Sequence, residues 1–185
     1  MIFIHIPRTG GTSVKHTLHV ALGGGATLFP TIHKPVGSVP PEPGQEFFSF
    51  VRDPWDRAVS LCAYALQYRN HVTEAGILPV EEFEAWVLTG ERTWYMATQV
   101  AFLRPYITQL KYLGRFERLE RDFRRFTQEH LAPLSVPALR RINISNRLPI
   151  MEYYQRQEII DVVGAEFWED IHLLGYDHAP IVARI

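Results

Sequence analysis

Apolar residues along this chain follow two kinds of pattern, short runs typical of strands and longer stretches with helical spacing. The short runs predict strands over residues 2–6, 28–32, 47–51 and 110–116, of which 2–6 is mostly apolar and 47–51 is the clearest. Apolar residues three or four positions apart predict helices over 12–22, from Pro54 onward, from Leu119 onward, and over 152–163 and 165–174. Strands and helices therefore alternate along much of the chain.

The clearest helix start lies in the sequence RDPWD, residues 52–56. Asp53 suits the N-cap position, Pro54 suits the first helical position, and Asp56 follows three residues after the cap. The residues that then recur on one face of the predicted helix are apolar: Trp55, Val59, Cys62 and Leu66.

Alternating strands and helices predict an α/β protein with a mostly parallel sheet. Proline and glycine interrupt residues 34–45, which we interpret as a surface excursion within one domain that covers residues 1–185. In parallel sheets of this kind, ligands bind beyond the carboxyl ends of the strands. The two most unusual loops of the sequence follow the strands predicted at 2–6 and 47–51.

Composition narrows the class of protein. Hydrophobic residues make up 46% of the 185 residues and the formal net charge is −1, values that favour a folded globular protein over a nucleic-acid-binding or membrane-surface protein. Cys62 is the only cysteine, so an internal disulfide is excluded. Without a long apolar stretch or a signal-peptide pattern, the sequence predicts a cytoplasmic protein without a membrane span.

The first unusual loop has the sequence HIPRTGGTS, residues 5–13. Adjacent Gly10 and Gly11 allow a tight turn in which backbone N–H groups point at one anion, and the following helix adds its positive end. The residues that we expect to bind the anion are Arg8, Thr9, Gly10, Gly11, Thr12 and Ser13. The loop lacks the Lys that an ATP-binding P-loop would place before the Thr-Ser pair. A plain Gly-Gly turn without a ligand is the alternative.

The second loop has the sequence FVRDPWDRAVS, residues 50–60. Arg52 is expected at the carboxyl edge of the sheet and Ser60 about two turns along the next helix, where both side chains can contact one phosphate. The alternative is that Arg52 forms an ion pair with a neighbouring carboxylate such as Asp53 or Asp56.

Together, IPRTGGTS and FVRDPWDRAVS resemble the motifs of sulfotransferases that use 3′-phosphoadenosine 5′-phosphosulfate (PAPS). The likeness is to the carbohydrate-directed branch, which includes heparan sulfate 2-O-sulfotransferase, and to its bacterial relatives. It extends to the sequence GRFE at residues 114–117 and to LGY at 174–176. The family normally has Lys where this chain has Arg8.

This resemblance implies a three-layer domain like that of P-loop NTPases, with helices flanking the sheet. It implies that the loop from Arg8 to Ser13 holds the 5′-phosphosulfate, that Arg52 and Ser60 bind the 3′-phosphate, and that Phe116 lies near the adenine. Transfer of the sulfuryl group to a hydroxyl of a carbohydrate or small molecule would release 3′-phosphoadenosine 5′-phosphate (PAP). This implied reaction would require no metal, because the transferred group carries less negative charge than a phosphoryl group.

The reaction needs a base to accept the proton of the acceptor hydroxyl, and histidine titrates in the suitable range. His33 is our candidate, because it ends a predicted strand and a histidine in a comparable stretch often serves as base in the resembling family. Glu42 and Glu46 are the next candidates, whereas His5 is expected to be structural. Gln99 is a candidate for acceptor contact and Arg147 for the 3′-phosphate site.

Two other functions remain open from the sequence. A small-molecule kinase of related fold would depend on Mg-ATP, and the missing Lys of the ATP-binding loop argues against it. A nucleotide-binding module without catalysis would bind PAP and show no turnover.

Overall fold

The computed structural model describes residues 1–23, 31–32, 41–67, 76–90, 96–140, 142, 147–177 and 179–180. The chain forms two compact units, and each is built from two separate stretches of sequence. The first unit takes residues 1–52 and 101–144, and the second takes residues 53–100 and 145–185. The single domain expected over 1–185 stays a prediction.

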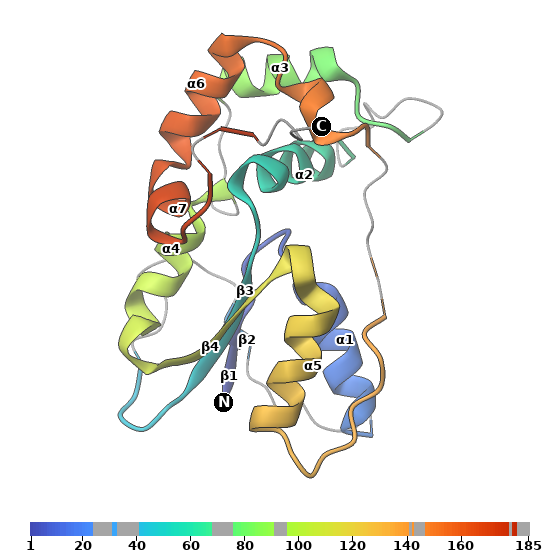
Figure 1. The fold of residues 1–185 in the computed structure, drawn as a ribbon, viewed down its shortest axis with the longest axis vertical. Helices are drawn as coiled ribbons and strands as arrows, with labels where there is room; N and C mark the ends of the chain where they lie inside the picture. Colours follow the sequence, from blue (N-terminus) through green and yellow to red (C-terminus); the bar gives the residue numbers. More distant parts are fainter. Residues whose placement is uncertain are drawn as a thin grey trace. The chain divides into compact units, whose positions relative to one another are not determined.

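A parallel sheet forms the centre of the first unit (Figure 1). Its strands in the described residues are β1 (Ile2–Ile4), β2 (Thr31–Ile32), β3 (Phe47–Val51) and β4 (Leu110–Arg115). They lie in the order β2-β1-β3-β4 and all pair in parallel. The predicted α/β class with a parallel sheet is therefore confirmed, and the predicted runs at 47–51 and 110–116 match β3 and β4 closely.

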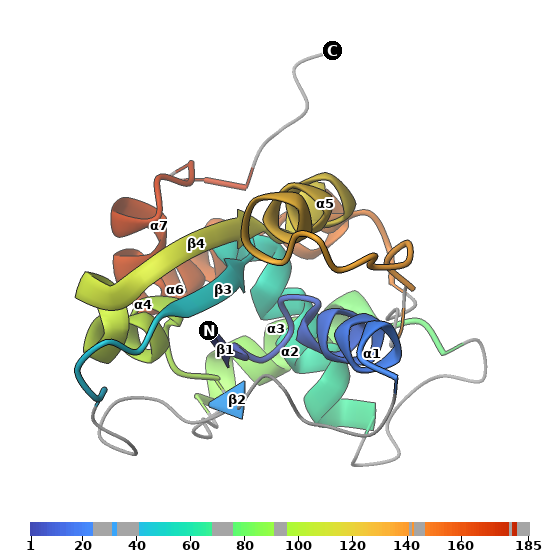
Figure 2. The same ribbon diagram turned by 90° about the horizontal axis from the view of Figure 1, so that it is seen from below.

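Two helices cover one face of this sheet, as Figure 2 shows from below. They are α1 (Gly11–Ala21) and α5 (Leu119–His130), which contribute Val14, Leu18, Phe123 and Phe126 to the core. Alternation along the strands turns Phe48 and Phe50 toward these helices, and the Phe48 ring stacks on that of Phe126 at 4.2 Å. On the opposite face of the sheet, Phe47 lies 4.6 Å from the ring of Tyr106 in the 3₁₀ helix η2 (Arg104–Gln109).

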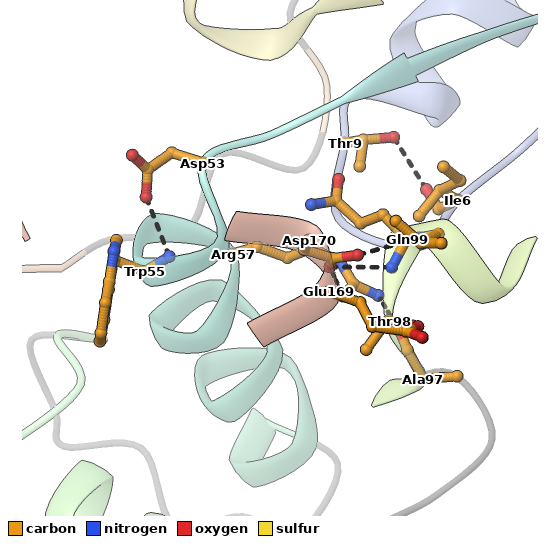
Figure 3. A network of polar contacts seen from close by, with 11 residues as sticks. Ile6, Thr9, Asp53, Trp55, Arg57, Ala97, Thr98, Gln99, Glu169 and Asp170 are labelled. Atoms are coloured by element: carbon orange, nitrogen blue, oxygen red, sulfur yellow. Dashed lines mark hydrogen bonds and ion pairs between the residues drawn. The ribbon is translucent and has the colours of Figure 1, made fainter. Parts of the chain in front are cut away.

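The second unit is helical in its described part, and its core gathers around α2 (Pro54–Gln67). Asp53 caps α2 as predicted, because its Oδ1 accepts the N–H group of Trp55 at 2.9 Å (Figure 3) and that of Asp56 at 3.1 Å. The predicted apolar face of α2 is buried: Trp55, Val59, Cys62 and Leu66. Burial raises the pKa of the Cys62 thiol far above its ordinary value, so this thiol stays protonated and inert.

The described residues also form four further α-helices and two further 3₁₀ helices: α3 (Val80–Thr89), α4 (Gln99–Leu103), η3 (Phe116–Arg118), η4 (Ile150–Tyr153), α6 (Gln157–Glu166) and α7 (Trp168–Leu173). The sequence pattern did not predict α3 or α4. It also began the helix at 152–163 too early, because residues 150–153 form η4 and α6 starts at Gln157. None of the helices in the described part of the chain has the length and apolarity needed to span a membrane.

Candidate functional site

The loop between β1 and α1 adopts left-handed backbone at two positions. Arg8 has φ 67° and Gly10 has φ 83°. Gly10 is also the N-cap residue of α1, and no side chain caps this helix. Left-handed backbone at a residue with a side chain costs free energy, so Arg8 marks a strained position of the kind that collects at functional sites. The turn directs the first N–H groups of α1 out of the helix end, as an anion-binding loop requires.

His5 and Gly11 fit against each other at the base of this loop. A Cβ atom added at Gly11 would lie 1.9 Å from Cδ2 of His5, so only glycine fits beneath the imidazole. The His5 ring in turn stacks on Phe3, with ring centroids 5.5 Å apart. His5 therefore packs between β1 and the first turn of α1, which agrees with the structural role expected for it.

We predict that Gly11→Ala lowers the free energy of unfolding by about 1–3 kcal/mol, because the methyl group collides with the His5 ring. Urea denaturation measures this loss. The double variant His5→Ala/Gly11→Ala removes the collision, so it should lose less than the sum of the two single variants. Additive losses would contradict this steric explanation.

The loop hydroxyls differ in their surroundings. The Thr9 hydroxyl is buried and donates to the carbonyl oxygen of Ile6 at 2.9 Å, so the side chain of Thr9 shapes the turn rather than facing a ligand (Figure 3). Ser13 accepts the N–H of Ile142 at 3.0 Å and keeps its own proton for donation. Thr12 is exposed at the helix start. Among these three residues the side chains of Thr12 and Ser13 thus remain candidate ligand contacts.

Arg52 connects the second motif to the loop. It follows β3 directly and is 4% exposed, and its Nη1 donates to the carbonyl oxygen of Arg8 at 3.0 Å. Its guanidinium carbon lies 4.0 Å from the centroid of the Phe116 ring. Phe116 also approaches Gly10 closely, since a Cβ there would lie 3.2 Å from the Phe116 ring. The structure thus brings together Arg8, Gly10, Arg52 and Phe116, four of the predicted site residues.

A carboxylate that sequence reasoning did not assign to the site fixes the turn after β4. Oδ2 of Asp122 accepts the backbone N–H of Arg115 at 2.9 Å, directly before Phe116. The backbone carbonyl of Asp122 accepts the Tyr112 hydroxyl at 2.6 Å. Arg118 and Arg121 pair with the same carboxylate at 3.5 and 3.3 Å. An acidic residue a few positions after a strand end, on the buried face of the next helix, was the available signal.

Several predicted site residues are not joined to this cluster. Ser60 is fully buried on α2 in the second unit, so its pairing with Arg52 around one phosphate stays a prediction. His33 lies outside the described residues, so its role as base also stays a prediction.

The two alternative bases lie at the wrong end of the sheet. Glu46 comes directly before β3, where its carbonyl oxygen accepts the N–H of Ile2 at 2.7 Å. Glu42 is held at the same end by its carbonyl oxygen, which accepts from Gln109 at 2.9 Å. The anion-binding loop lies beyond the carboxyl ends of the strands, so neither carboxylate is a suitable base there.

Two further candidates have structural partners within the second unit. Arg147 forms an ion pair with the carboxylate of Asp56 and also donates to the carbonyl oxygen of Asp56 at 3.1 Å. Gln99 is fully buried and donates its N–H to Oδ2 of Asp170 at 2.8 Å. These contacts support roles in folding for both residues.

Asp170 is the centre of a buried polar network in the second unit (Figure 3). Its Oδ1 accepts the N–H of Val100 at 2.9 Å, and Nη1 of Arg57 lies 3.8 Å from its Oδ2. Arg57 also donates to the carbonyl oxygen of Ala97 at 3.0 Å. Burial raises the pKa of Asp170, while the Arg57 charge and the hydrogen bonds with Gln99 and Val100 oppose that rise. The network fixes the start of α4 to α7.

The fold and this loop define an α/β protein whose parallel sheet carries a glycine-rich turn and two arginines at its carboxyl edge. Within the described residues, no group of three or more His, Cys, Asp or Glu side chains is arranged to hold a metal ion. The chain matches no family model and no curated protein. Any assignment of function therefore depends on the motifs and on the geometry of this site.

Proposed function

We propose that this protein is a PAPS-dependent sulfotransferase that acts on a hydroxyl of a carbohydrate or small molecule. The observation that carries the proposal is the position of Arg52. Its guanidinium donates to the Arg8 carbonyl oxygen in the glycine-rich turn and lies over the Phe116 ring. A cation held beside the uncapped start of α1 is suited to a ligand with two separate anionic groups.

The donor would be held by its phosphates. The backbone of the turn and the Ser13 hydroxyl would bind the 5′-phosphosulfate, and Arg52 would bind the 3′-phosphate. Ser60 is the proposed second contact of the 3′-phosphate. The three-layer arrangement like that of P-loop NTPases is part of this proposal, and the parallel sheet with α1 and α5 on one face is compatible with it.

The transfer step has a simple balance. The acceptor oxygen forms a new bond to sulfur, the bond between sulfur and the bridging oxygen breaks, and PAP leaves with the electron pair. The Arg8 side chain would stabilise the negative charge that develops on the leaving phosphate, since arginine stays protonated at neutral pH. The proton of the acceptor hydroxyl would pass to His33, the proposed base.

A thermal-shift comparison of PAP, PAPS and Mg-ATP tests the donor class. A ligand at about 100 times its Kd adds roughly 2.7 kcal/mol to the free energy of unfolding, which gives a measurable rise in Tm. PAP and PAPS should stabilise the protein while Mg-ATP does not. Stabilisation by Mg-ATP alone would favour the kinase, and PAP binding without sulfation of any acceptor would favour the non-catalytic module.

We predict that Arg52→Ala weakens binding of PAP by about 1.5–3 kcal/mol, because it removes a charge-assisted contact with the 3′-phosphate. Binding of adenosine 5′-phosphosulfate, which has no 3′-phosphate, should change far less. Isothermal titration of both ligands gives the comparison. Arg124→Ala is a matched control, since Arg124 is exposed on the outer side of α5 and pairs with Glu120. Equal losses for the two ligands would contradict the role of Arg52.

A further inference from the structure

The ring of Phe116 has a neighbour that the family resemblance does not imply. The resemblance places this aromatic residue near the adenine, where a base would stack on the ring. In the structure the guanidinium of Arg52 lies over the ring, 4.0 Å from its centroid. The backbone of the turn lies close to the same ring, because a Cβ at Gly10 would be 3.2 Å from Phe116 Cδ2. The ring face that the guanidinium covers is not open to a base.

Arg52 gains a fixed orientation from this contact. Its side chain has several rotatable bonds, yet it is 4% exposed, and its contacts include the Phe116 ring and the carbonyl oxygen of Arg8. Stacking on an aromatic face is a favourable arrangement for a guanidinium, and it leaves edge N–H groups directed sideways for hydrogen bonds. The Phe116 ring therefore orients the group that is proposed to bind phosphate.

The position of Phe116 is fixed by a contact between α5 and the backbone directly before it. It begins η3 directly after Arg115, and Asp122 on α5 accepts the Arg115 N–H at 2.9 Å. Asp122 is 7% exposed, so this bond is shielded from water. A continuous series of contacts thus leads from Asp122 through the backbone of Arg115 to Phe116 and on to Arg52.

We propose that Phe116 is a positioning residue for Arg52 rather than an adenine platform, and that Asp122 supports it. The inference rests on the proposed function for the identity of the ligand. It implies that recognition at this corner of the site depends on the 3′-phosphate and not on the base.

Two ligands that share adenine and differ in the 3′-phosphate separate these roles. Phe116→Leu keeps an apolar side chain but removes the aromatic face. We expect it to weaken PAP about 2- to 30-fold, the range of a cation–π contact. Binding of adenosine 5′-monophosphate should change less than about twofold. Phe116→Tyr keeps the face and should bind PAP nearly as the unchanged protein does. Comparable losses for both ligands with Phe116→Leu would instead identify an adenine platform and overturn the inference.

Asp122 is tested through its dependence on Phe116. Asp122→Ala should weaken PAP selectively, and it should cause little further loss of PAP binding when Phe116 is already leucine. Independent, additive losses would show that Asp122 does not act through Phe116.

A ligand-free measurement keeps the inference separate from the proposed function. The variants Arg52→Met and Phe116→Leu and their combination form a cycle of unfolding free energies in urea. Non-additive losses are expected if the guanidinium depends on the ring, and additive losses would overturn the inference. Failure of the unchanged protein to bind PAP would overturn the proposed function alone, because this cycle still decides how Arg52 and Phe116 are coupled.

Discussion

Arg8→Gly is expected to lower the turnover number about 10²–10³-fold without lowering the free energy of unfolding. The loss of turnover follows because the proposed role of the side chain is to stabilise charge on the leaving phosphate, and removal of one such group typically has an effect of this size. The free energy of unfolding should not fall, because Arg8 has φ 67° and glycine adopts that conformation more readily than arginine does. Sulfation kinetics and urea denaturation on the same variant give the two quantities.

Arg8→Lys is the matched control, because it keeps the positive charge and restores the residue that is usual in the resembling family. It should retain most of the turnover. An unchanged turnover number for Arg8→Gly would contradict the electrostatic role of Arg8. A large loss of unfolding free energy with glycine would contradict the interpretation of the backbone.

Asp170→Ala is expected to lower the free energy of unfolding by about 3–5 kcal/mol, because it leaves the buried Arg57 without its counter-charge. Both side chains are fully buried, and Asp170 also accepts the N–H groups of Gln99 and Val100. Asp161→Ala, an exposed change on α6, is the control and should have little effect. A loss for Asp170→Ala as small as that of the control would contradict the role of the network.

The same carboxyl group has a signature in the pH dependence of stability. Its folded pKa is raised above the ordinary value of 3.8. A group of this kind contributes stability that is fully present below its unfolded pKa and is lost as the pH rises through the folded pKa. Asp170→Asn removes this titration, so the difference in unfolding free energy between the unchanged protein and the variant should shrink as the pH rises above about 4. A difference that stays constant with pH would contradict the raised pKa.

The sequence predicted those strands and helices whose formation depends on residues within a few positions of one another. Phe47–Val51 is apolar and aromatic apart from Ser49, and a segment of that kind buries its side chains well within a sheet. Asp53 and Pro54 define the start of α2 because the cap and the fixed φ of proline act within a few residues. By contrast, α4 is five residues long and its first N–H groups depend on Asp170, about 70 residues further along the chain. No pattern within the helix can reveal such a partner.

The candidate site also contains local features that the sequence predicted and long-range contacts that it did not. Glycines followed by hydroxyl residues indicated the tight turn, and the turn exists with Gly10 at φ 83°. The contact of Arg52 with Phe116 joins residues 64 positions apart in sequence, and the bond from Asp122 to Arg115 depends on how α5 packs against β4. Glu46 precedes the strand at 47–51, so the sequence already placed it at the amino end of that strand, whereas the position of Glu42 depends on its contact with Gln109.

The division of each unit between two stretches of chain has a consequence for synthesis on the ribosome. The first unit needs β4, which ends at Arg115, to complete the sheet that β1 and β3 begin before residue 52. At about 5–20 residues per second, the roughly 64 residues between the ends of β3 and β4 take on the order of 3–13 s to emerge. During that interval the side of β3 that will pair with β4 has no partner from its own sheet, and the strand has the aromatic sequence FFSFV. Nascent chains in which β3 has left the ribosome and β4 has not should therefore be the ones that bind chaperones and aggregate most readily.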